Sequence, residues 1–347
     1  MTELGFRWSG GCDVDTAEGR YLYSGRGVCS TSDRRWDVIP FQSVSVVLPT
    51  RGRPRLLREA VRSVLGQTVA PSEIVVVDDG GGGEAERVLS PIRQAAGMPV
   101  RVVEGPGRGP GAARNAGMAE ATGELVAFLD DDDLWLPKKL EWQVEWFLRA
   151  PSVGVVGTLW TLWTEAEGIE GVEGAVGRKP PRLRRVSRRA LMKANRLATS
   201  GVVVRRKCVE RCGRFDESLA LAQDWELWLR MARNWEVGIV PARLVVYRRH
   251  EGQRSADRAR MRRWEGEVVR RALEGGDLGG RWLEGVGRRR LAWAHGRLGR
   301  LLAREGEIKG AIMELRESVN LFPYNPLVWT SLVRCALARR GWAGVKP

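Results

Sequence analysis

The chain has 347 residues, of which 43% are hydrophobic, so it can bury a substantial core and is not disordered throughout. Its 57 Lys and Arg residues outnumber 42 Asp and Glu residues, which gives a net charge of +15 and an isoelectric point near 10.4. Such a charge attracts polyanions, but no recognisable nucleic-acid-reading module accompanies it, so we expect no nucleic-acid partner. Five scattered cysteines favour a reduced, cytoplasmic protein over a disulfide framework.

Residues 1–42 are rich in Gly, Ser and charge without sustained periodicity, which predicts a poorly ordered leader. From Ser43 onward, short β-branched runs alternate with amphipathic helical segments. The predicted elements are strand 44–48, a helix opened by Pro54 and closed by Gly66, strand 73–77, helix 84–96, strand 100–104, helix 112–121 and strand 124–129. Strands that alternate with helices in this way predict a doubly wound α/β layer.

Three of the predicted strands are followed by candidate functional residues: Pro49-Thr50-Arg51, Asp78-Asp79 and the run Asp130–Asp133. In doubly wound sheets, ligands bind outside the carboxyl ends of the strands. Four adjacent carboxylates repel one another and need a compensating cation to remain ionised together. Carboxylate oxygens suit Mg²⁺ or Mn²⁺, so the run predicts a divalent metal site. A solvated acidic turn is the alternative, but the apolar return Leu134–Pro137 would hold the acids against the domain.

Arginine and lysine are concentrated between residues 168 and 189. Blocks of one charge are usually solvated loops, and we favour that interpretation here. Attraction to anionic lipid or to a lipid-phosphate acceptor is the less favoured alternative.

The C-terminal region carries a different pattern, which begins near Leu291. Its residues are spaced as in a helical repeat of about 34 residues, and the matching positions are Leu298, Gly299, Ala311, Leu315, Pro323, Trp329 and Leu332. This predicts one tetratricopeptide-like helix pair and one further helix. Because at least about three repeats are needed for independent stability, we expect this segment to pack on the preceding domain or on a protein partner.

Four segments, in order and in register, resemble the motifs of family 2 glycosyltransferases: Val44–Arg53, Ile74–Gly80, Gly111–Gly117 and Phe128–Pro137. The resemblance covers residues 43–250. It implies the GT-A fold, an α/β fold with a doubly wound mixed sheet and with nucleotide-binding and acceptor halves. We therefore expect a glycosyltransferase domain at 43–255 and a helical, tetratricopeptide-like appendage at 256–347.

The resemblance also implies how the donor would be bound. A nucleotide-diphosphate sugar is the expected donor. Pro49 and Asp79 would hold its nucleobase and ribose, Asp131 would lie near the ribose, and Arg114 would help to position the donor.

Other matching positions would bind the metal. Asp130 and Asp132 would be the two acids of a DXD motif, with Asp132 as a direct ligand of Mg²⁺ or Mn²⁺. His250 follows a predicted strand at 244–247, and in related enzymes a histidine after this strand can approach the metal or the diphosphate. A surface or structural role is the alternative for a lone histidine.

The catalytic base is expected at the start of a helix. Gln223-Asp224-Trp225 resembles the family's Glu-Asp-Trp segment, whose Asp is the base, although Gln223 departs from the commoner Glu. Asp224 thereby inherits the role of removing the proton from the acceptor hydroxyl. Capping of a helix over Trp225–Arg233 is the structural alternative for the same side chain.

The leading hypothesis is a metal-dependent, inverting, non-processive glycosyltransferase of cell-surface glycan assembly. No Gln-x-x-Arg-Trp segment follows Asp224 and no apolar stretch reaches roughly 18 residues, which disfavours a processive, membrane-embedded synthase. The expected acceptor is a glycan, a lipid-linked glycan or a protein, and peripheral contact with the anionic inner face of the cell membrane is also expected. The alternative hypothesis is a catalytically silent scaffold that binds protein partners through its helical tail.

Overall fold

The computed structural model describes residues 43–164, 179–250, 253, 257–275 and 280–339. The predicted leader at 1–42 and the first part of the basic stretch, up to residue 178, lie outside these residues. Among the described residues, no helix combines the length and the apolar character needed to cross a membrane.

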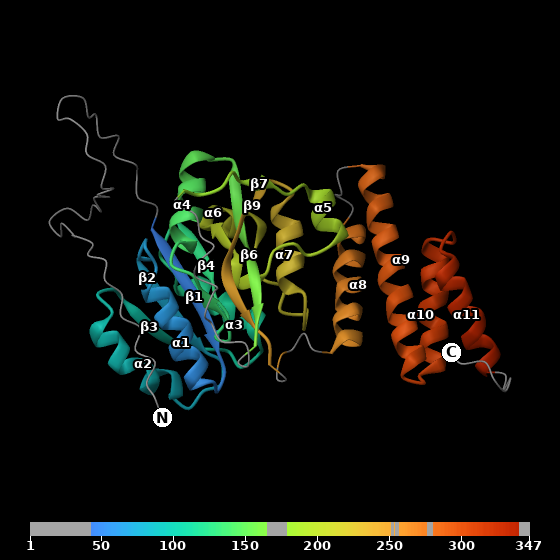
Figure 1. Cartoon of the computed structure of the whole chain (residues 1–347), viewed down its shortest axis with the longest axis horizontal. Helices are drawn as coiled ribbons and strands as arrows, with labels where there is room; N and C mark the ends of the chain where they lie inside the picture. Colours follow the sequence, from blue (N-terminus) through green and yellow to red (C-terminus); the bar gives the residue numbers. More distant parts are fainter. Residues whose placement is uncertain (1–42, 165–178, 251–252, 254–256, 276–279, 340–347) are drawn as a thin grey trace. The chain divides into compact units, whose positions relative to one another are not determined.

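A mixed sheet forms the centre of the region after residue 42, and among the described residues it contains nine strands (Figure 1). The strand order is β3-β2-β1-β4-β8-β6-β9-β5, and β7 pairs with β9 beside this path. The bounds are β1 Val44–Thr50, β2 Glu73–Asp78, β3 Val100–Glu104, β4 Leu125–Phe128, β5 Leu134–Trp135, β6 Val153–Trp163, β7 Arg184–Arg185, β8 Val203–Arg205 and β9 Glu236–Arg248. β1 to β4 are mutually parallel, whereas β8 is antiparallel to both β4 and β6.

Helices cover both faces of this sheet, because successive side chains of its strands point to opposite faces. In β1, Val46 and Leu48 belong to one buried core and Val47 to the other. The first core includes α1 (Pro54–Leu65), α2 (Glu84–Ala95) and α4 (Lys139–Arg149). The second includes α3 (Pro110–Glu120), α5 (Arg188–Lys193), α6 (Arg206–Cys212) and α7 (Gln223–Met231). The predicted α/β architecture is confirmed, and the predicted elements between residues 44 and 129 agree with the observed ones to within a few residues.

The C-terminal helices are α8 (Arg258–Glu274), α9 (Arg281–Arg304), α10 (Ile308–Leu321) and α11 (Pro326–Arg339). α8 packs on α7, and α9 packs on α5 and α8. Buried residues of α8 and of the first half of α9 join the second core of the sheet domain, whereas the second half of α9 forms a separate core with α10 and α11. A helical appendage that packs on the preceding domain is therefore observed. The boundary at 255 and the tetratricopeptide assignment stay predictions.

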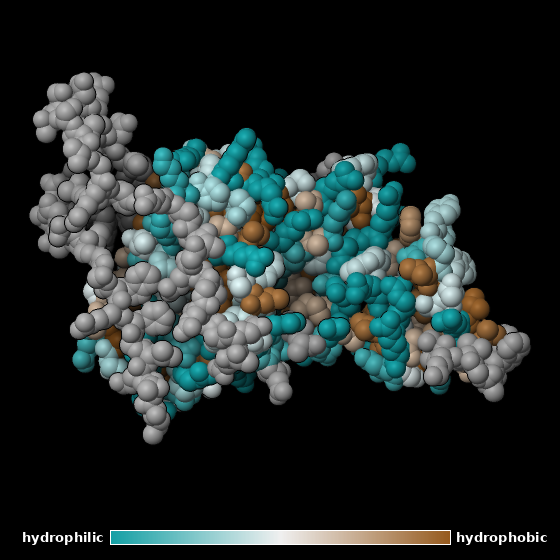
Figure 2. Space-filling view, in the orientation of Figure 1, coloured by the Kyte–Doolittle hydropathy of each residue, from teal (hydrophilic) through white to brown (hydrophobic). Residues whose placement is uncertain are grey.

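Apolar side chains are exposed at the end of this appendage, on α10 and α11 and in the link between them (Figure 2). They are Met313, Tyr324, Leu327, Trp329 and Val333. This exposure is compatible with the predicted protein partner, which stays a prediction.

Gly117 lets α3 lie directly on the sheet, and this close approach can be tested. A Cβ atom at Gly117 would lie 2.5 Å from Cγ1 of Val47 and 2.9 Å from Cγ2 of Val77. Because both valines are fixed in strands, Gly117→Ala should push the helix away and lower the free energy of unfolding by about 1–3 kcal/mol.

The matched control is Gly285→Ala in α9, where no heavy atom lies within 4 Å of the added Cβ. This change should leave stability unchanged or raise it by about 0.5–1 kcal/mol, because alanine favours helix more than glycine does. Denaturant unfolding of both variants measures the difference. Equal stability of the two would contradict the close approach of α3.

Candidate active site

The carboxyl ends of β1, β2 and β4 meet at one edge of the sheet, because these strands are parallel neighbours. There the Oγ1 atom of Thr50 donates a hydrogen bond to Oδ2 of Asp131 at 2.8 Å. Arg53, just before α1, donates from Nη1 to Asp131 at 3.2 Å and to Asp132 at 2.9 Å. Pro49 lies within β1, buried and opposite Val77. The predicted convergence of the strand ends is therefore present in the structure.

Three acids of the run after β4 are grouped closely enough to hold a metal ion. Carboxylate oxygens of Asp130, Asp132 and Asp133 lie within 4.8 Å of one another. Asp130 and Asp132 are partly exposed, whereas Asp133 is buried. Sequence reasoning named the first two and missed Asp133, although its place in the same acidic run was the available signal. An all-oxygen set of this kind fits a hard divalent cation such as Mg²⁺ or Mn²⁺.

Burial and mutual repulsion perturb the acids of this run. Burial raises the pKa of Asp131 to about 6, and the neighbouring charge of Asp132 contributes to the rise. Burial, followed by the charges of the neighbouring acids, raises the pKa of Asp133 well above its usual value. Asp133 accepts hydrogen bonds from Oγ of Ser200 at 2.5 Å and from the backbone N–H of Arg248 at 3.2 Å. A bound cation would relieve the repulsion and favour the ionised acids.

The end of β9 brings His250 to the acidic run. The Nε2 atom of His250 lies 3.0 Å from Oδ2 of Asp132. The guanidinium of Arg248 lies beside them: its Nε donates to the carbonyl of Asp132 at 3.2 Å, and its Nη2 donates to Glu59 at 2.6 Å. Asp130, Asp132 and His250, which the sequence analysis grouped, therefore lie together in space.

Asp79 supports the glycine-rich loop at residues 105–111. Its two carboxylate oxygens accept the backbone N–H groups of Gly107 at 2.8 Å and Gly109 at 3.0 Å. The loop also passes so close that a Cβ atom at Gly105 would lie 2.6 Å from Cα of Asp79. Asp79 therefore determines the shape of the loop that leads into α3, and its predicted contact with the nucleobase stays a prediction.

Arg114 lies between the acidic run and Asp224. Its side chain is only 8% exposed and forms an ion pair with Asp130. Its guanidinium also lies 5.5 Å from the ring centre of Phe215. The positive charge of Arg114 favours the ionised form of Asp224 as well. A single buried arginine thus interacts with both groups of acids that the sequence analysis had singled out.

Asp224 is in the first turn of α7 and is not its capping residue. The helix begins at Gln223, and Ala222 occupies the N-cap position without a side-chain cap. The structural alternative, in which Asp224 is the N-cap of a helix over Trp225–Arg233, is therefore not observed, although Oδ1 of Asp224 accepts a hydrogen bond from the backbone N–H of Trp225 at 2.8 Å. The helix begins two residues earlier than expected, because the chain turns into it through the left-handed conformation of Ala222 (φ 58°). Left-handed backbone at a non-glycine residue is strained, and such strain is often found at functional sites.

Two polar side chains orient the Asp224 carboxylate. Its Oδ2 atom accepts hydrogen bonds from Nδ2 of Asn195 at 2.8 Å and from Oγ1 of Thr199 at 3.2 Å. Burial raises the pKa of Asp224, and these hydrogen bonds oppose the rise in part. A carboxylate with a raised pKa is a stronger base near neutral pH. Sequence reasoning missed Asn195 and Thr199, since neither carries a local signal.

Known glycosyltransferases resemble this chain in sequence and in fold. Residues 45–162 match the model of the family described as Glycosyl transferase family 2. An uncharacterized glycosyltransferase of Nostoc sp. is 42% identical over 113 residues, which are 33% of this chain and 35% of that protein. The glucosyltransferase WfgD of Escherichia coli is 29% identical over 107 residues, 30% of this chain and 41% of that protein. The chain thus spans about a third of the length of the first curated relatives that it matches.

Solved structures share the fold. TarS of S. aureus in complex with UDP has a TM-score of 0.59 at 17% identity, with 86% of this chain and 92% of that chain covered. The mannosyltransferase PcManGT from Pyrobaculum calidifontis, in complex with GDP-Man and Mn²⁺, has a TM-score of 0.56 at 21% identity, with 90% and 91% covered. Residues 45–162 of this chain therefore match glycosyl transferase family 2, and the fold around them is the GT-A fold shared with these solved structures.

Proposed function

We propose that this chain transfers a glycosyl group from a nucleotide-diphosphate sugar to an acceptor hydroxyl, with inversion, in a metal-dependent and non-processive reaction. The observation that carries the proposal is the position of Arg114. It contacts Asp130 in the metal-capable run and also favours the ionised form of Asp224. The buried guanidinium of Arg114 thus interacts both with the proposed donor site and with the proposed base.

Related proteins support the substrate class. TarS and PcManGT were solved with UDP and with GDP-Man and Mn²⁺, respectively. WfgD is named as a glucosyltransferase that uses UDP-Glc and a GlcNAc-diphosphoundecaprenol acceptor. By this similarity, the donor is a nucleotide sugar, the metal is Mg²⁺ or Mn²⁺, and the reaction belongs to cell-surface glycan assembly.

At the donor end, Asp130, Asp132 and Asp133 would hold the metal, with His250 beside them. A bound divalent cation supplies positive charge that stabilises the negative charge developing on the leaving diphosphate. Pro49, Asp79 and Asp131 are our candidates for the nucleobase and ribose contacts. Arg114 adds a fixed positive charge next to the metal-capable acids.

At the acceptor end, Asp224 would accept the proton of the attacking hydroxyl. The hydroxyl oxygen forms the bond to the anomeric carbon as the bond from that carbon to the diphosphate oxygen breaks, and the nucleoside diphosphate leaves. Attack from the face opposite the leaving group inverts the anomeric centre. Asn195 and Thr199 orient the carboxylate for this step through their hydrogen bonds to Oδ2.

Contacts with larger partners are also part of the proposal. The net charge of +15 would favour peripheral contact with an anionic membrane on its cytoplasmic face. The exposed apolar residues of α10 and α11 would suit a protein partner.

The metal role predicts that Asp132→Asn weakens metal-dependent binding of UDP and GDP by about tenfold or more. The change keeps the size of the side chain but removes the charge of a proposed ligand. Calorimetric titration with Mn²⁺ and in EDTA measures the effect. Glu305→Gln, at an exposed position in the turn after α9, is the control and should bind as the wild type does. Equal binding by the wild type with Mn²⁺ and in EDTA would contradict the metal role.

The base role predicts that Asp224→Asn lowers the transfer rate by about 10²–10⁴-fold and leaves donor affinity little changed. The asparagine preserves shape but cannot accept the proton. Glu226→Gln is the control in the same turn, because the Glu226 carboxylate is already paired with Arg230 at 2.6 Å. Transfer rate and donor affinity are measured for both variants with an identified donor. A large rate loss in Glu226→Gln alone would assign the base to Glu226 instead.

The pKa of Asp224 predicts the pH dependence. Because burial raises this pKa and the base must be ionised, kcat/KM should fall with decreasing pH at a higher pH than for an exposed aspartate. Asn195→Ala removes a hydrogen bond that favours the ionised form, so the acidic limb should move to still higher pH. Asn320→Ala, exposed on α10, is the control. An unmoved limb in Asn195→Ala would show that this residue does not tune the base.

A further inference from the structure

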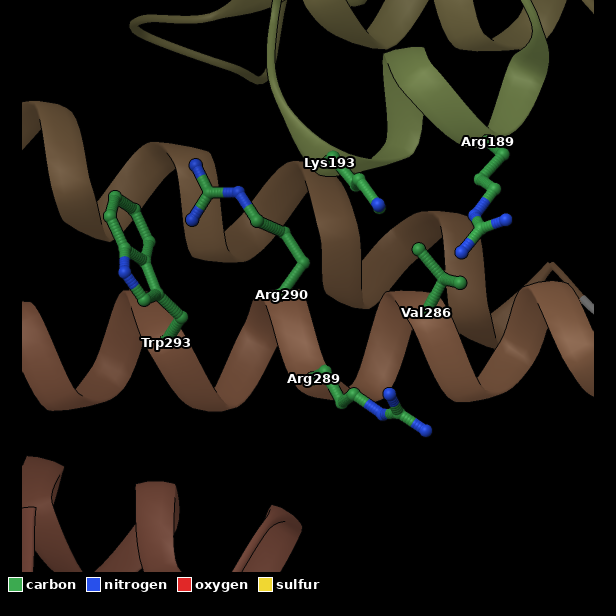
Figure 3. Close-up of a pocket in the computed structure, with 6 residues that line it drawn as sticks. All are labelled: Arg189, Lys193, Val286, Arg289, Arg290 and Trp293. Atoms are coloured by element: carbon green, nitrogen blue, oxygen red, sulfur yellow. The ribbon is translucent and has the colours of Figure 1, made fainter. Parts of the chain in front are cut away.

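A cationic pocket lies between α5 and α9, apart from the acidic run (Figure 3). Its volume is about 300 Å³, which is at the lower end of the range for ligand pockets. Figure 3 shows the side chains of Arg189 and Lys193 extending from α5 toward α9. The lining residues are Arg189, Lys193, Val286, Arg289, Arg290 and Trp293, so four of the six are basic and none is acidic.

The positive charge of this pocket is poorly compensated. Among the described residues, Arg189, Lys193 and Arg289 form no ion pair with a carboxylate. Arg290 pairs with Glu265 at 2.8 Å, but the same carboxylate is also paired with Arg262 at 2.5 Å. One carboxylate is thus shared by two arginines. The lining of the pocket therefore carries a net positive charge.

Arg290 provides buried donors that lack acceptors. Its side chain is only 8% exposed, and it lies between the rings of Trp225 and Trp293, 5.2 Å and 4.3 Å from their centres. Its Nε and Nη1 atoms have no hydrogen-bond partner within the described protein. A buried N–H group without an acceptor is costly. Oxygen atoms of an anion in the pocket would satisfy this requirement.

The pocket adjoins the proposed base. The indole N–H of Trp225, the residue after Asp224, donates to the carbonyl of Leu191 in α5 at 2.7 Å. The ring of Trp225 also contacts the guanidinium of Arg290. Just beyond α5, Asn195 bonds to Asp224 itself. The same helix thus carries pocket residues and leads directly to a residue that orients the base.

We propose that this pocket binds a phosphate or diphosphate group on the acceptor side of the reaction. The proposal rests on the function proposed above, since it names the class of acceptor that would be used. Planar guanidinium groups bind phosphate oxygens in pairs, and the lysine adds a compact charge. The group could belong to a soluble phosphorylated sugar or to the headgroup of a lipid-linked glycan, which present the same chemistry.

The test measures pyrophosphate binding by calorimetry in EDTA at low ionic strength, where the metal-dependent donor site should not bind it. The wild type should show saturable binding. Arg189→Ala/Lys193→Ala should weaken it about tenfold or more, because two charged contacts are removed at exposed positions. The charge-preserving variant Arg189→Lys/Lys193→Arg should retain most of the affinity.

The matched control is Lys309→Ala/Arg316→Ala, which removes the same two residue types from exposed positions of α10. It should bind pyrophosphate as the wild type does. The proposed anion site would be contradicted if the wild type showed no saturable pyrophosphate binding. It would also be contradicted if this control lost as much affinity for pyrophosphate as the double alanine variant.

Two further measurements distinguish a lipid headgroup from a soluble phosphate, and the proposed anion pocket from the proposed transferase reaction. Vesicles containing phosphatidylglycerol should bind the wild type more tightly than the double alanine variant if the source is a lipid headgroup; pyrophosphate binding without this difference supports a soluble phosphate.

Metal-dependent UDP binding should be equal in the wild type and the double alanine variant. Its loss in that variant would overturn the acceptor-side assignment. If neither the wild type nor any variant binds UDP but pyrophosphate binding is retained, the proposed transferase reaction is contradicted and the proposed anion pocket is not.

Discussion

The structure of the site depends on the repulsion among four adjacent aspartates at a partly buried strand end. Like charges in a medium of low polarity cannot remain ionised without nearby donors or cations. The protein supplies these from several elements: Thr50 at the end of β1, Arg53 just before α1, Arg114 from α3, Ser200 before β8, and Arg248 at the end of β9. The elements that meet at this edge of the sheet are therefore also the elements that stabilise its acids.

The change from parallel to antiparallel pairing at β4 brings the acidic run close to the proposed base Asp224. β8 runs antiparallel to β4, so the short 3₁₀ turn Thr199–Gly201 before it lies next to the acidic run. Two consecutive residues of this turn then face different acids: Thr199 donates to Asp224, and Ser200 donates to Asp133. Arg114 makes the second connection between the same two regions. Displacement of this turn would disturb the metal-capable acids and the proposed base together.

The helical appendage contributes to the surroundings of the proposed base Asp224. Arg290 of α9 stacks on Trp225, whose backbone N–H in turn bonds to Asp224. The first half of α9 shares the core of the sheet domain, while its second half packs with α10 and α11. The long helix α9 therefore connects the surroundings of the proposed base to a separate small core. The proposed anion pocket lies along that connection.

Local patterns in the sequence predicted the strands and helices up to residue 129 and the acidic run, because short β-branched runs, helical stripes and strand-end acids are properties of short segments. The candidate base Asp224 came from the family resemblance. Nothing local revealed Asn195 or the pairing of Ser200 with Asp133, which are contacts across 29 and 67 residues of chain. The start of α7 was also misjudged, since the left-handed turn at Ala222 has no glycine to signal it. The unpartnered donors of Arg290 could not be predicted from the sequence, because they result from the packing of α9 against α5 and from the contact of Arg290 with Trp225. Burial and hydrogen-bond satisfaction are properties of the packed molecule and not of the residue.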